Sequence, residues 1–179
     1  MIKIKVHDAK SIGDEFLNGF DRSESVYYAY RKTENGLKLT EARYDEFWDN
    51  EDLKMQSQSL KSTVISGGYV VAIHDPSSLR VLAFAALEAG KFGQMKEYVN
   101  LSALHVSCES RGLGYGRVLF EHLKSYANDL GIEAFYISAS SCENAQNFYR
   151  KIGCVEAEEI NRDLAEKEPY DVQMEFVLK

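Results

Sequence analysis

The sequence predicts an α+β fold with a mixed, mostly antiparallel central sheet flanked by helices. Two apolar runs at 69–73 and 81–87 are joined by a short turn, and a third run at 98–106 precedes a helical pattern and another strand-like run. The first two runs predict an antiparallel hairpin, and the strand–helix–strand unit predicts one right-handed crossover between parallel strands. Because the 179 residues contain no internal repeat and no linker-like stretch, we expect one domain.

The first third of the chain is predicted to contain three strands and two helices. Asn35-Gly36 is a strong hairpin-turn signal, and the residues on both sides of it are rich in strand formers. A later polar stretch has the pattern of a helix that is closed by Gly67-Gly68. The predicted elements are strands at 2–6, 26–30 and 37–40 and helices at 11–20 and 48–65.

The remainder of the chain has clearer patterns. The two hairpin strands are apolar throughout, which predicts burial on both faces of the sheet. After the third run, apolar residues recur at helical spacing from 118 to 130, and Gly131 is suited to end that helix in a left-handed conformation. Ser140 and Glu143 have the spacing of a capping box before a short helix that Gly153 closes. The remaining strands are predicted at 134–139, 155–160 and 172–178.

The composition argues against several classes of function. The net charge of -7 and the pI near 5.2 oppose nucleic-acid binding, which depends on clustered Lys and Arg. The three cysteines form no CxxC pair, so we expect neither a disulfide framework nor a zinc site. No secretory signal and no long uncharged stretch is recognisable, which predicts a cytoplasmic protein without a membrane partner.

The turn at 111–116, Arg-Gly-Leu-Gly-Tyr-Gly, has the composition of an anion site. Its glycines let the backbone fold tightly, and the helix that follows presents its positive end to the turn. It is not a P-loop, because Arg117 and Val118 follow where that motif requires Lys and then Ser or Thr. Its GxGxG spacing also differs from the dinucleotide fingerprint. From these residues alone, two interpretations of the turn are equally supported, a diphosphate-binding site and a turn that binds no ligand.

Two motifs in this order resemble the GCN5-related N-acetyltransferase (GNAT) superfamily. The first motif places Gln or Arg ahead of glycines in a strand-to-helix turn, and the matching residues here are Arg111, Gly114 and Gly116. The second is a short helix with Ala, two residues, Phe-Tyr and then Gly, matched by Ala145, Phe148, Tyr149 and Gly153. Segments 21–24 and 168–171 are similar to a bacterial small-molecule-type branch, which supplies no substrate.

The resemblance implies a GNAT-like acyl-CoA N-acyltransferase fold, with acetyl-CoA as co-substrate and no metal. The turn and the start of its helix would hold the pyrophosphate through backbone amides, and the end of the third run would pair with pantetheine like an additional strand. Such pairing requires the third run to splay away from 134–139. The implied cofactor-binding residues are Leu104, His105, Val106, Arg111, Gly112, Leu113, Gly114, Tyr115, Gly116 and Arg117.

The resemblance also assigns catalytic roles. Tyr149 would be the general acid that protonates the departing thiolate, whereas spacing alone favours core packing for this residue. Asn100 stands where some members carry a catalytic Glu, and Glu97 is a weak substitute as base. Asn144 is a further candidate for cofactor binding, displaced by two residues from the position of a frequent family Asn. For His105, a buried core histidine is the alternative.

The implied reaction is transfer of an acetyl group from acetyl-CoA to a primary amine of a small molecule. An acyl-CoA-binding or sensing module of the same fold without turnover is the alternative. We expect 1–68 to be a variable acceptor-side region and 69–179 the acyl-CoA-binding core of the single domain. The acceptor, the acyl length and the oligomeric state, a homodimer included, are left open. An acidic cluster either lines a pocket for a cationic amine or is a solvated helix face; it comprises Asp45, Glu46, Asp49, Glu51 and Asp52 around Phe47 and Trp48.

Overall fold

A seven-stranded mixed sheet forms the centre of the molecule. The computed structural model describes residues 3–178. The strand order is β1-β4-β5-β6-β7-β9-β8, and β6 and β7 form the one parallel pair of that sheet among the described residues. The predicted mixed, mostly antiparallel sheet is therefore confirmed. The strands are β1 (Ile4–His7), β4 (Tyr69–His74), β5 (Val81–Phe92), β6 (Tyr98–Val106), β7 (Ala134–Ala139), β8 (Val155–Glu156) and β9 (Val172–Val177).

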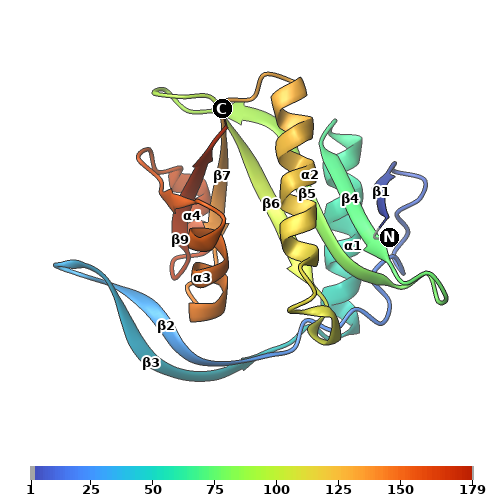
Figure 1. Cartoon of the computed structure of the whole chain (residues 1–179), viewed down its shortest axis with the longest axis horizontal. Helices are drawn as coiled ribbons and strands as arrows, with labels where there is room; N and C mark the ends of the chain where they lie inside the picture. The colour runs from blue at the N-terminus through green and yellow to red at the C-terminus, as the bar shows by residue number, and fades with distance from the viewer. Residues whose placement is uncertain (1–2, 179) are drawn as a thin grey trace.

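Helices cover both faces of this sheet. α1 (Asn50–Ile65) packs against β4 and β5 on one face, and α2 (Tyr115–Asp129) packs against β5 and β6 on the other (Figure 1). α2 is the predicted crossover helix between the parallel strands. α3 (Glu143–Lys151) follows β7, and the short α4 (Arg162–Lys167) lies between β8 and β9. No helix within residues 3–178 is long and apolar enough to cross a membrane.

The hairpin strands β4 and β5 are buried on both faces, as their continuous apolar sequence predicts. Val71 and Ala85 face a hydrophobic cluster that contains the apolar stripe of α2, while Val70 and Ala86 face a second cluster that contains Leu53 and Leu60 of α1. Because neighbouring residues of one strand point to opposite faces, both clusters are fixed by the same two strands. This part of the sheet, buried on both faces, supports the end of β6 through the β5–β6 pairing.

β6 and β7 are joined at one end and separate at the other. Tyr98, Val99 and Asn100 pair with 134–136, and the parallel ladder then stops. The rest of β6 remains paired with β5 on its other side, while β7 continues along β9. In Figure 1 the two strands diverge downward, toward the turn that precedes α2. The splay that the cofactor hypothesis requires is therefore present.

A separate two-stranded ribbon crosses the open end of this splay. β2 (Glu24–Thr33) and β3 (Gly36–Glu46) form the predicted hairpin, which is longer than the sequence pattern indicates. It runs along the lower side of the molecule in Figure 1, below α3. The Tyr30 N–H donates to the Ser141 carbonyl at 2.8 Å, so the ribbon is attached to the start of α3.

Several predicted elements are wrong or displaced. Segment 11–20 is a series of turns rather than a helix, because its hydrogen bonds run from residue i to i−3 and Gly19 adopts φ +75°. The N-cap of α3 is Cys142 without a side-chain cap, so Ser140 and Glu143 form no capping box. The strand expected at 155–160 ends at Glu156, and the first residue expected in β1, Ile2, lies outside the described residues.

Candidate functional site

The turn between β6 and α2 presents a row of free backbone donors. Gly112 and Gly114 adopt φ values of +79° and +83°, which residues with a side chain rarely adopt. Within the described part of the chain, the N–H groups from Gly112 to Arg117 donate to no protein acceptor. They stand at the positive end of α2, where a helix favours negative charge. The turn is therefore built to receive an anion with several acceptor oxygens.

Gly116 holds this turn against α3. A Cβ atom at Gly116 would lie 3.3 Å from two ring carbons of Phe148, which is closer than most side chains tolerate. The glycine therefore lets the first turn of α2 pack against the Phe148 ring. The two sequence motifs, one on each helix, are thus in direct contact at the open end of the splay.

The side chain of Arg111 fixes the turn from behind. Its Nε donates to the Val106 carbonyl at 3.2 Å, and its two terminal nitrogens donate to the carbonyls of Ser23 at 2.8 Å and Arg22 at 3.1 Å. The guanidinium therefore joins the end of β6 to the segment before β2. The guanidinium is engaged with backbone carbonyls and holds the turn in place.

The end of β6 has one strand edge without a partner strand. Leu104, His105 and Val106 pair with β5 on one side, whereas β7 has already diverged on the other. Such an edge can accept an extended ligand as an additional strand. The His105 ring is half-buried between Trp48 and Phe84, with ring centroids 4.9 and 5.3 Å away. Burial and the nearby arginines lower its pKa to about 3, so the ring is neutral at pH 7.

Tyr149 projects from α3 into the core beside the splay. Its side chain is only 9% exposed and packs within the cluster below α2. Its hydroxyl makes no hydrogen bond with residues 3–178. The hydroxyl oxygen is also not among the polar side-chain atoms of these residues that are fully buried without a partner, so it is accessible to solvent. Burial, followed by the charges of Cys154 and Asp171, raises the pKa of Tyr149. The hydroxyl is therefore protonated and available as a donor.

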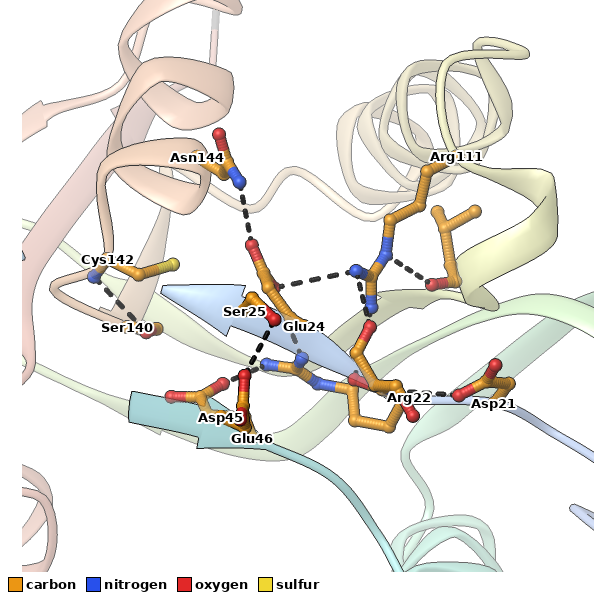
Figure 2. Close-up of polar contacts among 12 residues, drawn as sticks. Asp21, Arg22, Glu24, Ser25, Asp45, Glu46, Arg111, Ser140, Cys142 and Asn144 are labelled. Atoms are coloured by element: carbon orange, nitrogen blue, oxygen red, sulfur yellow. Dashed lines mark hydrogen bonds and ion pairs between the residues drawn. The ribbon is translucent and has the colours of Figure 1, made fainter. Parts of the chain in front are cut away.

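A network of charges crosses the open end of the splay (Figure 2). Glu24 accepts a hydrogen bond from Asn144 Nδ2 at 2.9 Å and lies 3.8 Å from Arg111, so it links α3 to the turn before α2. Arg22 bonds to Glu24 at 3.2 Å and to Glu46 at 2.8 Å. One N–H of the Asn144 amide is thus engaged with Glu24.

A cavity of about 350 Å³ lies beside this network, and part of the predicted acidic cluster lines it. Asp45, Glu46, Phe47 and Trp48 contribute to its wall, together with Arg22 and His105. The other acidic residues have a different role, because Asp49 and Asp52 form a reciprocal capping box at the start of α1. The cluster is therefore divided between an acidic and aromatic pocket and a helix cap.

The two residues considered at the base position lie in or just before the closed part of the β6–β7 ladder. Asn100 is 4% exposed and pairs with Tyr136, so it belongs to the closed part of the β6–β7 ladder. Glu97 precedes that ladder and is bound to Lys91 at 2.6 Å. The two ends of β6 are separated by about 27 Å at the usual rise of a strand. Glu97 is therefore distant from the anion turn.

Three polar residues at this site were not identified from the sequence as site residues. Arg22, Glu24 and Asp171 belong to segments whose similarity to other bacterial chains carried no role. The structure places Arg22 and Glu24 in the charge network, and it places Asp171 beside Ser138 at the end of β7. Among the described residues, no group of His, Cys, Asp and Glu is arranged to hold a metal ion.

Comparison with known proteins gives one family and many similar structures. The model of the family "Acetyltransferase (GNAT) domain" matches residues 50–174. No curated protein matches the chain. Nourseothricin acetyltransferase superposes with a TM-score of 0.70 at 13% identity, covering 99% of both chains. A putative streptothricin acetyltransferase from Bacillus anthracis str. Ames, in complex with acetyl coenzyme A, gives a TM-score of 0.70 at 15% identity, covering 99% of this chain and 98% of that one. The structure of the KacTA–DNA complex gives a TM-score of 0.60 at 17% identity, covering 99% of this chain and 94% of that one.

Proposed function

The chain belongs to the GNAT acetyltransferase family, and we propose that it transfers an acetyl group from acetyl-CoA to the primary amine of a small molecule. The observation that carries the proposal is the row of free N–H groups from Gly112 to Arg117 at the positive end of α2. A diphosphate offers several acceptor oxygens with negative charge, which is the ligand that such a turn favours.

The donor would lie along the splay between β6 and β7. Its diphosphate would accept hydrogen bonds from the turn, and its extended arm would follow the unpaired edge of Leu104–Val106. The amine nitrogen attacks the thioester carbon, and the resulting tetrahedral intermediate then releases the thiolate. Tyr149, protonated at neutral pH and without a hydrogen-bond partner among residues 3–178, supplies the proton to that sulfur.

The acceptor would approach from the pocket beside the ribbon. Asp45 and Glu46 give that pocket negative charge, and Trp48 gives it an aromatic wall. Both features favour a cationic ligand, through Coulomb attraction and through contact of the cation with the ring face. A small molecule that carries a protonated primary amine fits this chemistry. Acetyltransferases of nourseothricin and streptothricin are among the structural neighbours, but their low identities support the shared fold alone.

Turnover with a panel of primary amines tests the proposal. Release of free thiol from acetyl-CoA should accelerate when a suitable amine is added. Tyr149→Phe should reduce kcat by about 10² or more if the hydroxyl is the general acid, while acetyl-CoA still binds. Phe148→Leu, at the adjacent position, is the control for a packing defect of α3.

The rival function is binding or sensing of acyl-CoA without turnover. By the sequence resemblance, Asn100 stands at the position of a catalytic Glu in some family members, and this residue favours the rival. Slow hydrolysis of acetyl-CoA that no amine accelerates would support this rival and contradict the proposed transfer. Unchanged turnover by Tyr149→Phe with an amine substrate would contradict only the assignment of the acid.

A further inference from the structure

Asp171 lies at the end of the splay that the ribbon crosses. It directly precedes β9, whose first residue, Val172, pairs with Ala139 at the end of β7. Its side chain is half-buried and accepts a hydrogen bond from the Ser138 hydroxyl at 3.2 Å. The carboxylate therefore stands at the end of β7 that has diverged from β6.

A directed chain of hydrogen bonds orients this carboxylate. The Asn161 N–H donates to the Tyr136 hydroxyl at 3.0 Å, which donates to Gln173 Oε1 at 2.8 Å. Gln173 Nε2 donates to the Ser138 hydroxyl at 2.9 Å, and that hydroxyl donates to Asp171. Because every hydrogen bond in this series points toward Asp171, the series fixes the rotamers of the Tyr136, Gln173 and Ser138 side chains. The last acceptor is the carboxylate beside the cleft.

The charges around Asp171 are mostly negative. Burial and the charges of Glu168 and Glu46 raise its pKa to about 6, against the opposing hydrogen bond from Ser138. After burial and the charge of Cys154, the charge of Asp171 also raises the pKa of Tyr149, so the two groups interact electrostatically. Residues 3–178 provide no cation in an ion pair with Asp171. It therefore remains a proton acceptor near neutral pH.

Three other carboxylates near the open end of the splay have closer partners than Asp171 has. Glu24 and Glu46 are bound to Arg22, and Asp45 accepts the Ser25 hydroxyl at 2.6 Å. A carboxylate held by a guanidinium is a poor base, because the positive charge stabilises its deprotonated form. Asp171 combines a place at the diverged end of β7, an electrostatic interaction with Tyr149 and a raised pKa.

We propose that Asp171 is the general base that removes a proton from the ammonium group of the acceptor. This inference rests on the proposed transfer of an acetyl group to an amine. One proton passes from the ammonium to the Asp171 carboxylate, and the neutral amine forms the new C–N bond to the thioester carbon. The C–S bond then breaks, and Tyr149 gives its proton to the sulfur. The second amine proton restores the Tyr149 hydroxyl through solvent, and Asp171 releases its proton to water.

The pH dependence of kcat/KM distinguishes a base from a merely structural residue. With a primary amine from the panel, wild-type kcat/KM should rise about tenfold per pH unit below pH 6 and then level off. Asp171→Asn should lower kcat/KM at pH 7 by about 10² or more and should lose that plateau. Its rate should instead continue to rise with pH, because only amine that is already neutral can react.

Two neighbouring variants should move the midpoint of this rise in opposite directions. Ser138→Ala removes a hydrogen bond that stabilises the deprotonated carboxylate, so the midpoint should move to higher pH. Glu168→Gln removes a negative charge that favours protonation, so the midpoint should move to lower pH. Glu166→Gln, an exposed substitution of the same charge on α4, should leave the profile unchanged. Calorimetry with acetyl-CoA should give wild-type affinity for Asp171→Asn and so verify that the variant is folded.

Each outcome decides the inference. Two results together support Asp171 as the base. The plateau must be lost in Asp171→Asn, and the midpoint of the pH profile must shift in opposite directions in Ser138→Ala and Glu168→Gln. A plateau retained in Asp171→Asn overturns the inference while the proposed transferase function stands. A wild-type chain that acetylates no amine overturns both, a result that differs from the previous one because it appears without any substitution.

Discussion

Gly114→Ala tests how a left-handed glycine in the turn before α2 affects two properties, the stability of the protein and the binding of acetyl-CoA. Gly114 is the N-cap of α2 with φ +83°, and a Cβ atom there would meet no protein atom within 4 Å. The substitution therefore adds backbone strain without a clash inside the protein. The added Cβ would occupy open space at the turn where we place the diphosphate.

Gly131→Ala is the matched control for this substitution. Gly131 follows the other end of α2, has φ +66° and also has no protein atom within 4 Å of an added Cβ. A left-handed conformation costs a residue with a side chain about 1–2 kcal/mol, so both variants should lose a similar free energy of unfolding. In a chain of this size, that loss corresponds to a decrease in Tm of roughly 2–8 °C.

The binding data should differ between the two variants. Calorimetric titration with acetyl-CoA should give wild-type affinity for Gly131→Ala and a loss of at least about tenfold, or 1.4 kcal/mol, for Gly114→Ala. Thermal unfolding followed by circular dichroism gives the stability of both variants. Equal affinities for the two variants, at equal losses of stability, would refute the placement of the diphosphate at this turn.

Three further predictions concern stability and partners. Glu24→Gln should lower the free energy of unfolding by about 1–3 kcal/mol because it disrupts a largely buried charge network, whereas Glu41→Gln, in an exposed pair, should change it by less than about 0.5 kcal/mol in denaturant titrations. Burial and then the charge of His74 lower the pKa of His7 from 6.5 to about 4, so the unfolded chain takes up a proton over that range that the folded chain does not. The free energy of unfolding should therefore decrease as the pH falls from 6.5 to 4, with a smaller slope in His7→Gln; equal slopes would contradict the assignment. Finally, a labelled DNA duplex should show no binding in fluorescence anisotropy at about 10 μM protein in physiological salt, given the net charge of -7, and saturable binding would refute this expectation.

The parts of the fold that the sequence predicts correctly are those with strong local signals. β4 and β5 are continuous apolar runs, and the hydrophobic stripe of α2 begins after a glycine turn and ends before Gly131. In each of these cases the local preference and the tertiary burial agree. The ribbon β2–β3 is longer than predicted because most of its residues are exposed, so burial imposes no alternation of apolar and polar residues on it.

Segment 11–20 shows how tertiary contacts override a periodic pattern. Ile12, Leu17 and Phe20 have spacings that suit a helix, and all three are buried beneath α1. The Leu17 N–H donates to the Ser57 hydroxyl of α1 at 3.2 Å rather than to a carbonyl of its own segment. Gly19 then turns the chain with a positive φ. A compact series of turns buries the same side chains that a helix would bury.

Some parts of the candidate site depend on residues that are close in sequence, and other parts depend on contacts between distant segments. The anion turn could be predicted because its glycine spacing and the following helix are contiguous in sequence. The network around Glu24 could not, since Arg111 and Asn144 are brought to it by the splay and by the ribbon. No spacing rule relates Ser138 to Asp171, and their contact depends on the pairing of β7 with β9.

Calorimetric comparison of acetyl-CoA with acetyl-pantetheine tests the central claim most directly, because acetyl-pantetheine keeps the thioester arm and lacks the nucleotide diphosphate. If the free N–H groups of the turn before α2 hold the diphosphate, acetyl-CoA should bind the wild-type chain saturably, at one molecule per chain. Acetyl-pantetheine should then bind at least about 10²-fold more weakly, because several charge-assisted hydrogen bonds are lost. Equal binding of the two ligands, or no heat with acetyl-CoA at millimolar concentration, would contradict the account.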